Sequence, residues 1–297
     1  MNDYTKLLSR AESLVERLEN LLPPAQKSPD WSAAVAYRWR KKQGRGALEP
    51  VMQVHRIDLR DLRGIDEQKA SVERNTRQFV ESLPANNVLL TGARGTGKSS
   101  LVKALLNKYA SRGLRLIEVE KQDLVDLPEI VEQICVRPER YILYCDDLSF
   151  EADEPGYKAL KVVLDGSIAA ASDNCLIYAT SNRRHLMPEY MSENLEYKHI
   201  GEEIHPGETS EEKISLSERF GIAVSFYPFD QDEYLNIVAV WLEHFQVSDA
   251  RSEAVHKAAL QWSLMRGSRS GRVAWQFARD WAGRTGLKSQ PHRKTRA

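Results

Sequence analysis

The sequence predicts an α/β protein in which helices cover both faces of a parallel sheet. Five apolar runs of strand length recur along the chain, segments with helical periodicity separate most of them, and the strands stop after Pro228. Strands that are apolar throughout indicate burial on both faces, as in parallel sheets with crossover helices. The chain has 297 residues, of which 42% are hydrophobic, so it is long enough for one large domain or two unequal ones.

The first predicted strand is the run NVLLTG, which leads into a glycine-rich turn and then into the helical pattern KSSLVKALLNKY. Four further apolar runs follow. The five predicted strands are 87–92, 114–120, 141–147, 174–182 and 221–228. A helical pattern also precedes the first strand, and another, YKALKVVLDGSIAAA, lies between the third and the fourth. This alternation predicts one sheet of five parallel strands.

The part of the chain before these strands is predicted to be helical. Between Tyr4 and Leu22, apolar residues recur at three- and four-residue steps, and two prolines end the pattern. Asp30 is a candidate N-cap for a second short helix over 31–40. The basic run RWRKKQGRG that follows is interpreted as a solvated hinge. The alternative is a contact with nucleic acid or another partner, in which Trp39 stacks.

The part after the last strand is also predicted to be helical. Three patterns over 230–245, 252–265 and 271–283 predict a small helical unit. Asp230 and Glu233 have the spacing of a capping box at the start of the first of these helices. The terminal run KSQPHRKTRA is polar and basic, which favours a loose tail.

The composition excludes several classes of protein. Lys and Arg together number 42, as do Asp and Glu, so the formal net charge is zero, which argues weakly against a dedicated nucleic-acid-binding protein. No apolar run approaches the roughly 20 residues that span a bilayer, and the N-terminus lacks the apolar centre of a signal peptide. We therefore expect a cytoplasmic protein with no membrane partner. The three cysteines are widely spaced, which indicates buried free thiols.

A phosphate-binding motif lies between the first predicted strand and the helix after it. The segment GARGTGKS fits the pattern G-x-x-x-x-G-K-[ST]. Such a loop wraps phosphates with its backbone N–H groups, and the helix presents its N-terminus to the anion. Lys98 is predicted to reach the β- and γ-phosphates, and the Ser99 hydroxyl to bind Mg²⁺. The predicted nucleotide-binding residues of the loop are Gly92, Ala93, Arg94, Gly95, Thr96, Gly97, Lys98, Ser99 and Ser100.

Two carboxylates follow the third predicted strand, in the segment YILYCDDL. Hydrolysis needs a carboxylate for the metal ion and a base for the attacking water. Asp146 is predicted to hold Mg²⁺ together with Ser99, directly or through water, and Asp147 to polarise the water. ATP and Mg²⁺ are therefore the predicted cofactors.

The order of these motifs resembles that of the AAA+ ATPases, which belong to the P-loop NTPase superfamily. The resemblance implies a three-layer αβα sandwich with a five-stranded parallel sheet, a small helical lid at the C-terminus and a helical N-terminal extension. Members commonly have Asp-Glu at the second motif, whereas this chain has Asp146 and Asp147. Because aspartate is one methylene shorter than glutamate, slow turnover is one expectation. Assistance from Glu151, in LSFEADE, is another.

The resemblance extends to three further polar residues. Asn182 in LIYATSNRR resembles sensor 1, which implies a hydrogen bond to the lytic water or the γ-phosphate. Arg219 in KISLSERFGI resembles an arginine finger, which would reach the γ-phosphate bound to a neighbouring subunit. Arg272 in RGSRSGRVAWQF resembles the start of the sensor-2 helix, with Arg269 as the competing residue.

A closer resemblance is to a bacterial ATP-binding family called domain of unknown function 815. The segments GIDEQKASVERNTRQFVESLPANN and YCDDLSFE carry it, and the Asp-Asp pair is the expected form in that family. The AAA+ resemblance also implies that Gly64 and Ile65 flank the adenine base. The predicted units are a helical N-terminal extension (1–57), an AAA+ nucleotide-binding α/β domain (58–228), a helical lid domain (229–285) and a basic flexible tail (286–297).

Together these features predict an AAA+ ATPase that hydrolyses Mg-ATP to remodel or load a macromolecular partner. The expected partners are ATP or ADP, further copies of the chain in a nucleotide-bound homo-oligomer such as a hexamer, and an unknown protein. One alternative is an ATP-dependent assembly scaffold or switch with little turnover. Another is a DNA-associated loader of the replication type, although nucleic acid is the less favoured partner. The acidic segment 183–215 is interpreted either as a partner-binding or nucleotide-sensitive loop or as a solvated insertion.

Overall fold

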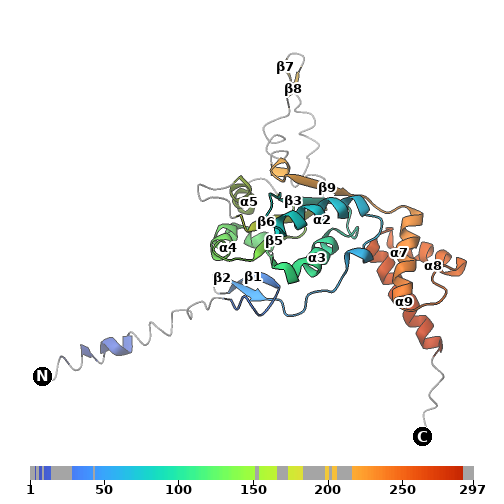
Figure 1. The fold of residues 1–297 in the computed structure, drawn as a ribbon, viewed down its shortest axis with the longest axis horizontal. Helices are drawn as coiled ribbons and strands as arrows, with labels where there is room; N and C mark the ends of the chain where they lie inside the picture. Colours follow the sequence, from blue (N-terminus) through green and yellow to red (C-terminus); the bar gives the residue numbers. More distant parts are fainter. Residues whose placement is uncertain are drawn as a thin grey trace, which may run out of the picture.

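The structure, a computed structural model, contains one mixed sheet with helices on both faces and a helical unit at one end (Figure 1). The described residues are 4, 7–8, 10–14, 29–42, 44–150, 154–165, 173–182, 198–200, 203–205 and 216–289. Among these residues, no helix combines the length and the apolar character needed to cross a membrane.

The sheet has seven strands in the order β2-β1-β4-β5-β6-β3-β9. Its strands are β1 (Ala36–Lys42), β2 (Arg45–Pro50), β3 (Val88–Gly92), β4 (Leu114–Glu118), β5 (Arg140–Cys145), β6 (Cys175–Ser181) and β9 (Ile222–Phe226). The five predicted strands are β3, β4, β5, β6 and β9, and each pairs in parallel with its neighbours among them. The predicted fold class is therefore confirmed.

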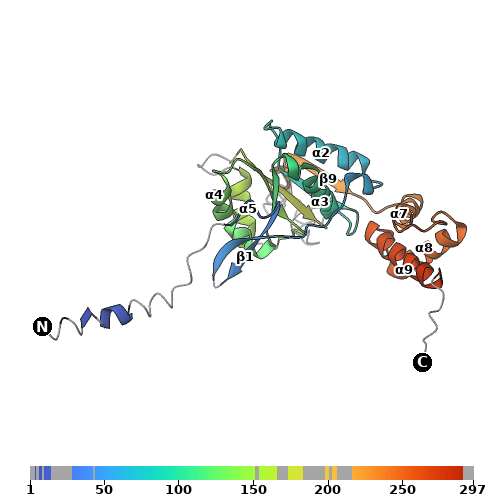
Figure 2. The ribbon, with the colours of Figure 1, turned by 60° about the horizontal axis from the view of Figure 1, so that its bottom comes forward.

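One face of the sheet is covered by α2 (Asp66–Val80) and α3 (Lys98–Tyr109), which lie side by side in both views (Figures 1 and 2). The other is covered by α4 (Leu127–Ile134) and α5 (Pro155–Asp165). Successive strand residues point to opposite faces, so Val88 and Leu90 join the core under α2 and α3, while Leu89 joins the core under α4 and α5. Two apolar layers thus hold the sheet in place.

The helical lid consists of α7 (Gln231–His244), α8 (Glu253–Arg266) and α9 (Gly271–Ser289), which pack against one another. The predicted capping box is confirmed: the Glu233 amide donates to the Asp230 carboxylate at 2.8 Å, and the Asp230 amide donates to the Glu233 carboxylate at 3.0 Å. Helix α9 continues to Ser289, beyond the predicted start of a loose tail at 286. The boundaries of the four predicted units otherwise stay predictions.

The helix predicted over 31–40 is wrong, because this segment contains β1. Strand β1 pairs in parallel with β4 and antiparallel with β2, so the sheet has two more strands than predicted. The decisive signal is a two-residue alternation of aromatic and basic side chains: Tyr37 and Trp39 are completely buried against α4, and Arg38 and Arg40, which alternate with them, point to the other face. An N-terminal extension that is helical throughout is therefore also wrong.

The interpretation of the basic run as a hinge, and of Trp39 as a stacking residue, is wrong as well. Trp39 is buried, and its indole N–H donates to the Asp126 carboxylate at 2.8 Å. The basic side chains of β1 each pair with an acidic one. These ion pairs are Arg38–Glu118 (2.6 Å), Arg40–Glu120 (2.6 Å), Lys41–Asp126 (2.8 Å) and Lys42–Glu49. The positive charge of β1 is therefore balanced within the chain.

Some predictions concern residues outside the described part of the chain. Most of the predicted first helix, Glu151, and most of the acidic segment 183–215 lie there. Within the acidic segment, the described backbone forms two short antiparallel strands, β7 (Lys198–Ile200) and β8 (Glu203–His205). The three cysteines are free, as predicted, although Cys135 is exposed rather than buried.

The burial of Trp39 leads to a prediction about stability. Trp39→Ala removes a buried indole and its hydrogen bond, and should lower the free energy of unfolding by about 3–5 kcal/mol. Arg40→Ala, the control, removes an exposed ion pair and should cost about 1 kcal/mol or less. Chemical denaturation measures both. Unchanged stability of Trp39→Ala, combined with weaker binding of single-stranded nucleic acid, would restore the stacking interpretation.

Candidate functional site

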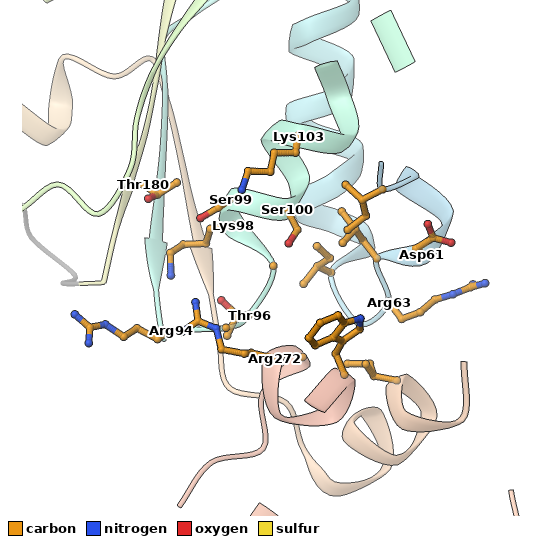
Figure 3. A pocket seen from close by; sticks show the side chains of 18 of the residues that line it. Asp61, Arg63, Arg94, Thr96, Lys98, Ser99, Ser100, Lys103, Thr180 and Arg272 are labelled. Carbon is orange, nitrogen blue, oxygen red and sulfur yellow. The ribbon is translucent and has the colours of Figure 1, made fainter. Parts of the chain in front are cut away.

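A cavity of about 660 Å³ opens where the carboxyl ends of β3, β5 and β6 meet the start of α3 and the lid helices (Figure 3). The concave edge at the carboxyl ends of parallel strands is the usual ligand site of such sheets. The predicted site residues that line the cavity are Ile65, Arg94, Gly95, Thr96, Gly97, Lys98, Ser99, Ser100, Asp146, Asp147, Asn182 and Arg272. Segments more than a hundred residues apart in sequence thus contribute to one cavity.

Lys98 is the first residue of α3, and its ammonium group lies inside the phosphate loop. Its Nζ donates to the carbonyl oxygens of Gly92 at 2.6 Å and Ala93 at 2.8 Å, and to Oδ1 of Asn182 at 3.2 Å. Burial lowers the pKa of Lys98, and the charges of Asp146 and Asp147 oppose that effect. Gly92 and Ala93 therefore do not line the cavity. Their carbonyl oxygens position the Lys98 side chain instead.

The Asp146 carboxylate, at the end of β5, connects three elements. Its Oδ1 accepts hydrogen bonds from the Ser99 hydroxyl of α3 at 2.9 Å and from the Thr180 hydroxyl of β6 at 2.5 Å. Burial by itself would raise the pKa of Asp146, but polar contacts with the hydroxyls of Thr180, Tyr144 and Ser99 lower it below its ordinary value. The carboxylate is therefore ionised at neutral pH.

This group of oxygens fits a divalent cation. Mg²⁺ binds hard oxygen ligands, typically one or two from the protein, with water and phosphate oxygens completing the set. A Ser99 hydroxyl next to an ionised Asp146 carboxylate supplies such a pair. The buried Tyr144 hydroxyl lies beside them and forms no hydrogen bond of regular geometry. It is therefore a further polar group next to the Ser99–Asp146 pair.

Asp147 has a left-handed backbone conformation, with φ of 56°. The Asp147 amide donates to the Thr180 hydroxyl at 2.9 Å, and the Leu148 amide donates to the Thr180 carbonyl at 2.7 Å. The resulting turn brings the Asp147 carboxylate to the Asn182 side-chain amide, which donates to it. Aspartate tolerates positive φ better than most side chains, which is a physical reason for aspartate, rather than glutamate, at this position.

The lid contacts the phosphate loop directly. The Gly271 amide at the start of α9 donates to the Gly95 carbonyl at 2.9 Å. Gly95 has φ of 77°, and a Cβ atom there would lie 2.9 Å from Oγ of Ser270 and 3.2 Å from Cβ of Arg272. Arg272 lines the cavity, whereas its competitor Arg269 is exposed and does not. The backbone of α9 is therefore coupled to the loop independently of the Arg272 charge.

The two residues expected beside the adenine base have different surroundings. Ile65 lines the cavity and approaches Gly97, whereas Gly64 does not line it and packs against Phe229 of the lid connection. The rest of this end of the cavity is formed by side chains that the sequence-based prediction did not include. These are His55, Ile57, Asp61, Leu62, Arg63, Phe229, Ile237, Trp241 and Trp275. This end combines aliphatic and aromatic side chains with His55, Asp61 and Arg63, and the other end holds the phosphate loop and the two aspartates, which together give the cavity the character of a nucleotide site.

Arg219 does not line this cavity. It precedes β9, between the buried residues Leu216 and Phe220, and forms an ion pair with Asp165 at the end of α5. Strand β9 runs parallel to β3, so Arg219 lies at the opposite edge of the sheet from the phosphate loop, about 16 Å away along a five-residue strand. Arg219 is thus unable to complete the cavity of its own chain.

The sequence-based prediction omitted Thr180, Lys103 and Tyr144, and simple periodicities could have identified them. Residues two apart on a strand share a face, which relates Tyr144 to Asp146 and Thr180 to Asn182. Lys103 lies one helical turn after Ser99, and its amino group points toward it in Figure 3. Each residue lies beside one that the motifs had already identified.

Comparisons with known proteins agree with the fold. The RuvB Holliday junction branch migration motor of Thermotoga maritima is 15% identical, with a TM-score of 0.52, and the alignment covers 79% of this chain and 67% of that chain. A variant of the same motor is 16% identical, with a TM-score of 0.51 and coverage of 79% and 67%. At such low identity the likeness shows the fold alone. No protein with a curated description matches this chain.

The model of a family described as protein of unknown function (DUF815) matches residues 32–285, which include both the α/β sheet and the lid. The matched range contains every residue that lines the cavity. The chain therefore belongs to the DUF815 family and has the fold of the AAA+ P-loop ATPases.

Proposed function

We propose that the protein is an ATPase that binds Mg-ATP in the cavity beneath the lid and hydrolyses it. The observation that carries the proposal is the contact network at the carboxyl edge of the sheet. Lys98 and Asp147 both contact Asn182, and Ser99 contacts Asp146. The Thr180 hydroxyl joins these two groups, because it donates to Asp146 and accepts from the Asp147 amide. This arrangement supports roles for Lys98 as the phosphate-binding cation, for Ser99 and Asp146 as metal ligands, and for Asp147 as the base for water.

In this proposal each residue has a distinct task. The loop amides and Lys98 hold the β- and γ-phosphates, while Ser99 and Asp146 hold Mg²⁺. Mg²⁺ held there would supply positive charge that offsets the negative charge developing on the phosphate oxygens. Asp147 accepts a proton from the attacking water, which Asn182 orients. The Arg272 guanidinium, at the start of α9 in the lid, contacts the phosphates.

Arg219 is proposed to act on the nucleotide of a neighbouring copy of the chain. Its position at the far edge of the sheet supports this, because a group there faces outward from its own cavity. A guanidinium offers several planar donors to the charge of the transition state. Activity would then depend on assembly into a homo-oligomer, and a hexamer is one such form.

The work of the ATPase is proposed to be remodelling or loading of a macromolecule, with an unknown protein as the favoured partner. RuvB is named for branch migration of Holliday junctions, and DNA loading is the corresponding alternative for this chain. The balanced charges of β1 weigh against it, because Arg38, Arg40, Lys41 and Lys42 are each paired with a carboxylate. Binding to DNA requires Lys and Arg side chains that are available to replace the counterions of the DNA phosphates. The basic side chains of β1 already have carboxylate partners.

A nucleotide switch with little turnover is the second candidate. The contacts of Asp147 favour it: its Oδ1 accepts a hydrogen bond from Asn182, and its Oδ2 lies 3.5 Å from Arg94. A carboxylate engaged in this way is a weaker base for water. Mg²⁺-dependent phosphate release at high protein concentration separates the two candidates, because tight ATP binding without release favours the switch.

Asp147→Asn tests the proposed base. Asparagine also tolerates positive φ, so the turn should persist and ATP affinity should stay within about threefold of the wild type. Hydrolysis should fall by about 10²-fold or more, because general-base catalysis contributes that much. Equilibrium binding of a fluorescent ATP analogue and steady-state phosphate release measure the two effects. Hydrolysis at the wild-type rate would remove Asp147 from this role.

Complementation between two variants tests the shared site. Turnover should fall about 10³-fold in Arg219→Ala, because the neighbouring cavity loses its guanidinium. Asp147→Asn should be inactive because it lacks the proposed base in its own cavity. A mixture should recover activity, because an intact cavity can then lie next to an intact Arg219. Arg251→Ala, which removes the exposed ion pair with Glu243, is the control and should stay active. Failure of the mixture to exceed either variant alone would argue that Arg219 does not act between subunits.

Gly95→Ala tests the contact between the loop and the lid. The added Cβ would collide with Ser270 and should move α9 away from the loop, so ATP affinity should fall about tenfold or more. Gly113 has φ of 92° with no neighbour within 4 Å, so Gly113→Ala carries similar backbone strain, about 1–2 kcal/mol, without a collision. Equal ATP affinity in the two variants would show that the contact is dispensable.

A further inference from the structure

Tyr144 on β5 is a buried residue that the proposed mechanism leaves unused. It lies two positions before Asp146, and only 1% of the residue is exposed. Its hydroxyl faces Ser99, Asp146 and Thr180 but forms no hydrogen bond of regular geometry with any of them. A polar atom is thus buried beside the proposed metal ligands without a settled partner.

The other completely buried tyrosines in the described part of the chain are different. Each has its hydroxyl in a hydrogen bond. The partners are Asp30 for Tyr37 (3.1 Å), Glu73 for Tyr109 (2.5 Å), Glu139 for Tyr141 (3.2 Å), Thr76 for Tyr178 (2.8 Å) and Ala259 for Tyr234 (3.2 Å). A buried hydroxyl without a partner costs about 1–3 kcal/mol, and phenylalanine would fill the same apolar volume. The Tyr144 oxygen therefore gains less from its surroundings than the hydroxyls of the other buried tyrosines do, and a further partner in another state of the protein would make use of it.

We propose that Tyr144 is a positioning residue of the metal site, whose hydroxyl holds the Asp146 carboxylate and the Ser99 hydroxyl in place when a divalent cation is bound with nucleotide. This inference rests on the proposed Mg-ATP site. A tyrosine hydroxyl is both a donor and an acceptor, so it can serve either neighbour. Groups that hydrogen-bond to metal ligands set the orientation of those ligands, and their loss commonly weakens metal binding about 10–100-fold.

Tyr144→Phe removes one oxygen atom and tests the proposal directly. Binding of a fluorescent ATP analogue is titrated with MgCl₂, and binding of Mn²⁺ is followed by electron paramagnetic resonance. Half-saturation should need about tenfold more of either cation than in the wild type. Affinity for the analogue in EDTA should be unchanged. Stability in denaturant should be equal to that of the wild type or higher, because an unsatisfied hydroxyl is lost.

Tyr178→Phe is the matched control, since Tyr178 pairs with Tyr144 on the adjacent strand and is also completely buried. Its hydroxyl is bonded to Thr76 and Asn75, so this variant should lose stability and keep the wild-type cation dependence. Unchanged cation dependence in Tyr144→Phe, or a loss of stability matching that of Tyr178→Phe, would overturn the proposal. If cations do not affect binding to the wild-type protein, the Mg-ATP site itself fails, and the inference fails with it.

Discussion

The hydrogen bonds to the Asp146 carboxylate are the interaction on which the rest of the site depends. Ser99 belongs to the helix after the phosphate loop and Thr180 to the neighbouring strand, and both donate to the same oxygen. Burial alone would favour the protonated acid, so these contacts also maintain the charge that a cation needs. A shift of β5, β6 or α3 would therefore change the proposed metal ligands and the phosphate loop together.

Thr180 extends this arrangement to Asp147. The hydroxyl that donates to Asp146 also accepts from the Asp147 amide, so one side chain positions both carboxylates. The left-handed turn at Asp147 is a strained conformation of a kind that often occurs at functional sites, at a cost of about 1–3 kcal/mol. Aspartate reduces that cost, which gives the Asp-Asp pair a conformational reason.

The site is connected to both ends of the molecule by different physical means. Toward the lid, a backbone hydrogen bond joins Gly95 to Gly271, so the lid contacts the loop without using a charged side chain. Toward the other edge of the sheet, Arg219 lies between the buried Leu216 and Phe220 and pairs with Asp165, outside the cavity of its own chain. The first connection lies within the chain, whereas the role proposed for Arg219 requires a second copy of the chain.

By itself, the sequence determined the five parallel strands, the phosphate loop, the lid helices and the capping box at Asp230, because apolar periodicity and fixed motif spacing are local properties. The sequence-based prediction was wrong at β1, although the alternation of aromatic and basic residues there is a strand signal; the partners of Trp39 and Arg38 show that the aromatic face is the buried one. Periodicity places Thr180 and Tyr144 near the site, but only the tertiary structure shows that Thr180 joins the two aspartates, that Tyr144 faces Asp146, and that Arg272 rather than Arg269 lines the cavity. These facts depend on contacts between distant segments, and such contacts exist only after the sheet has brought the segments together.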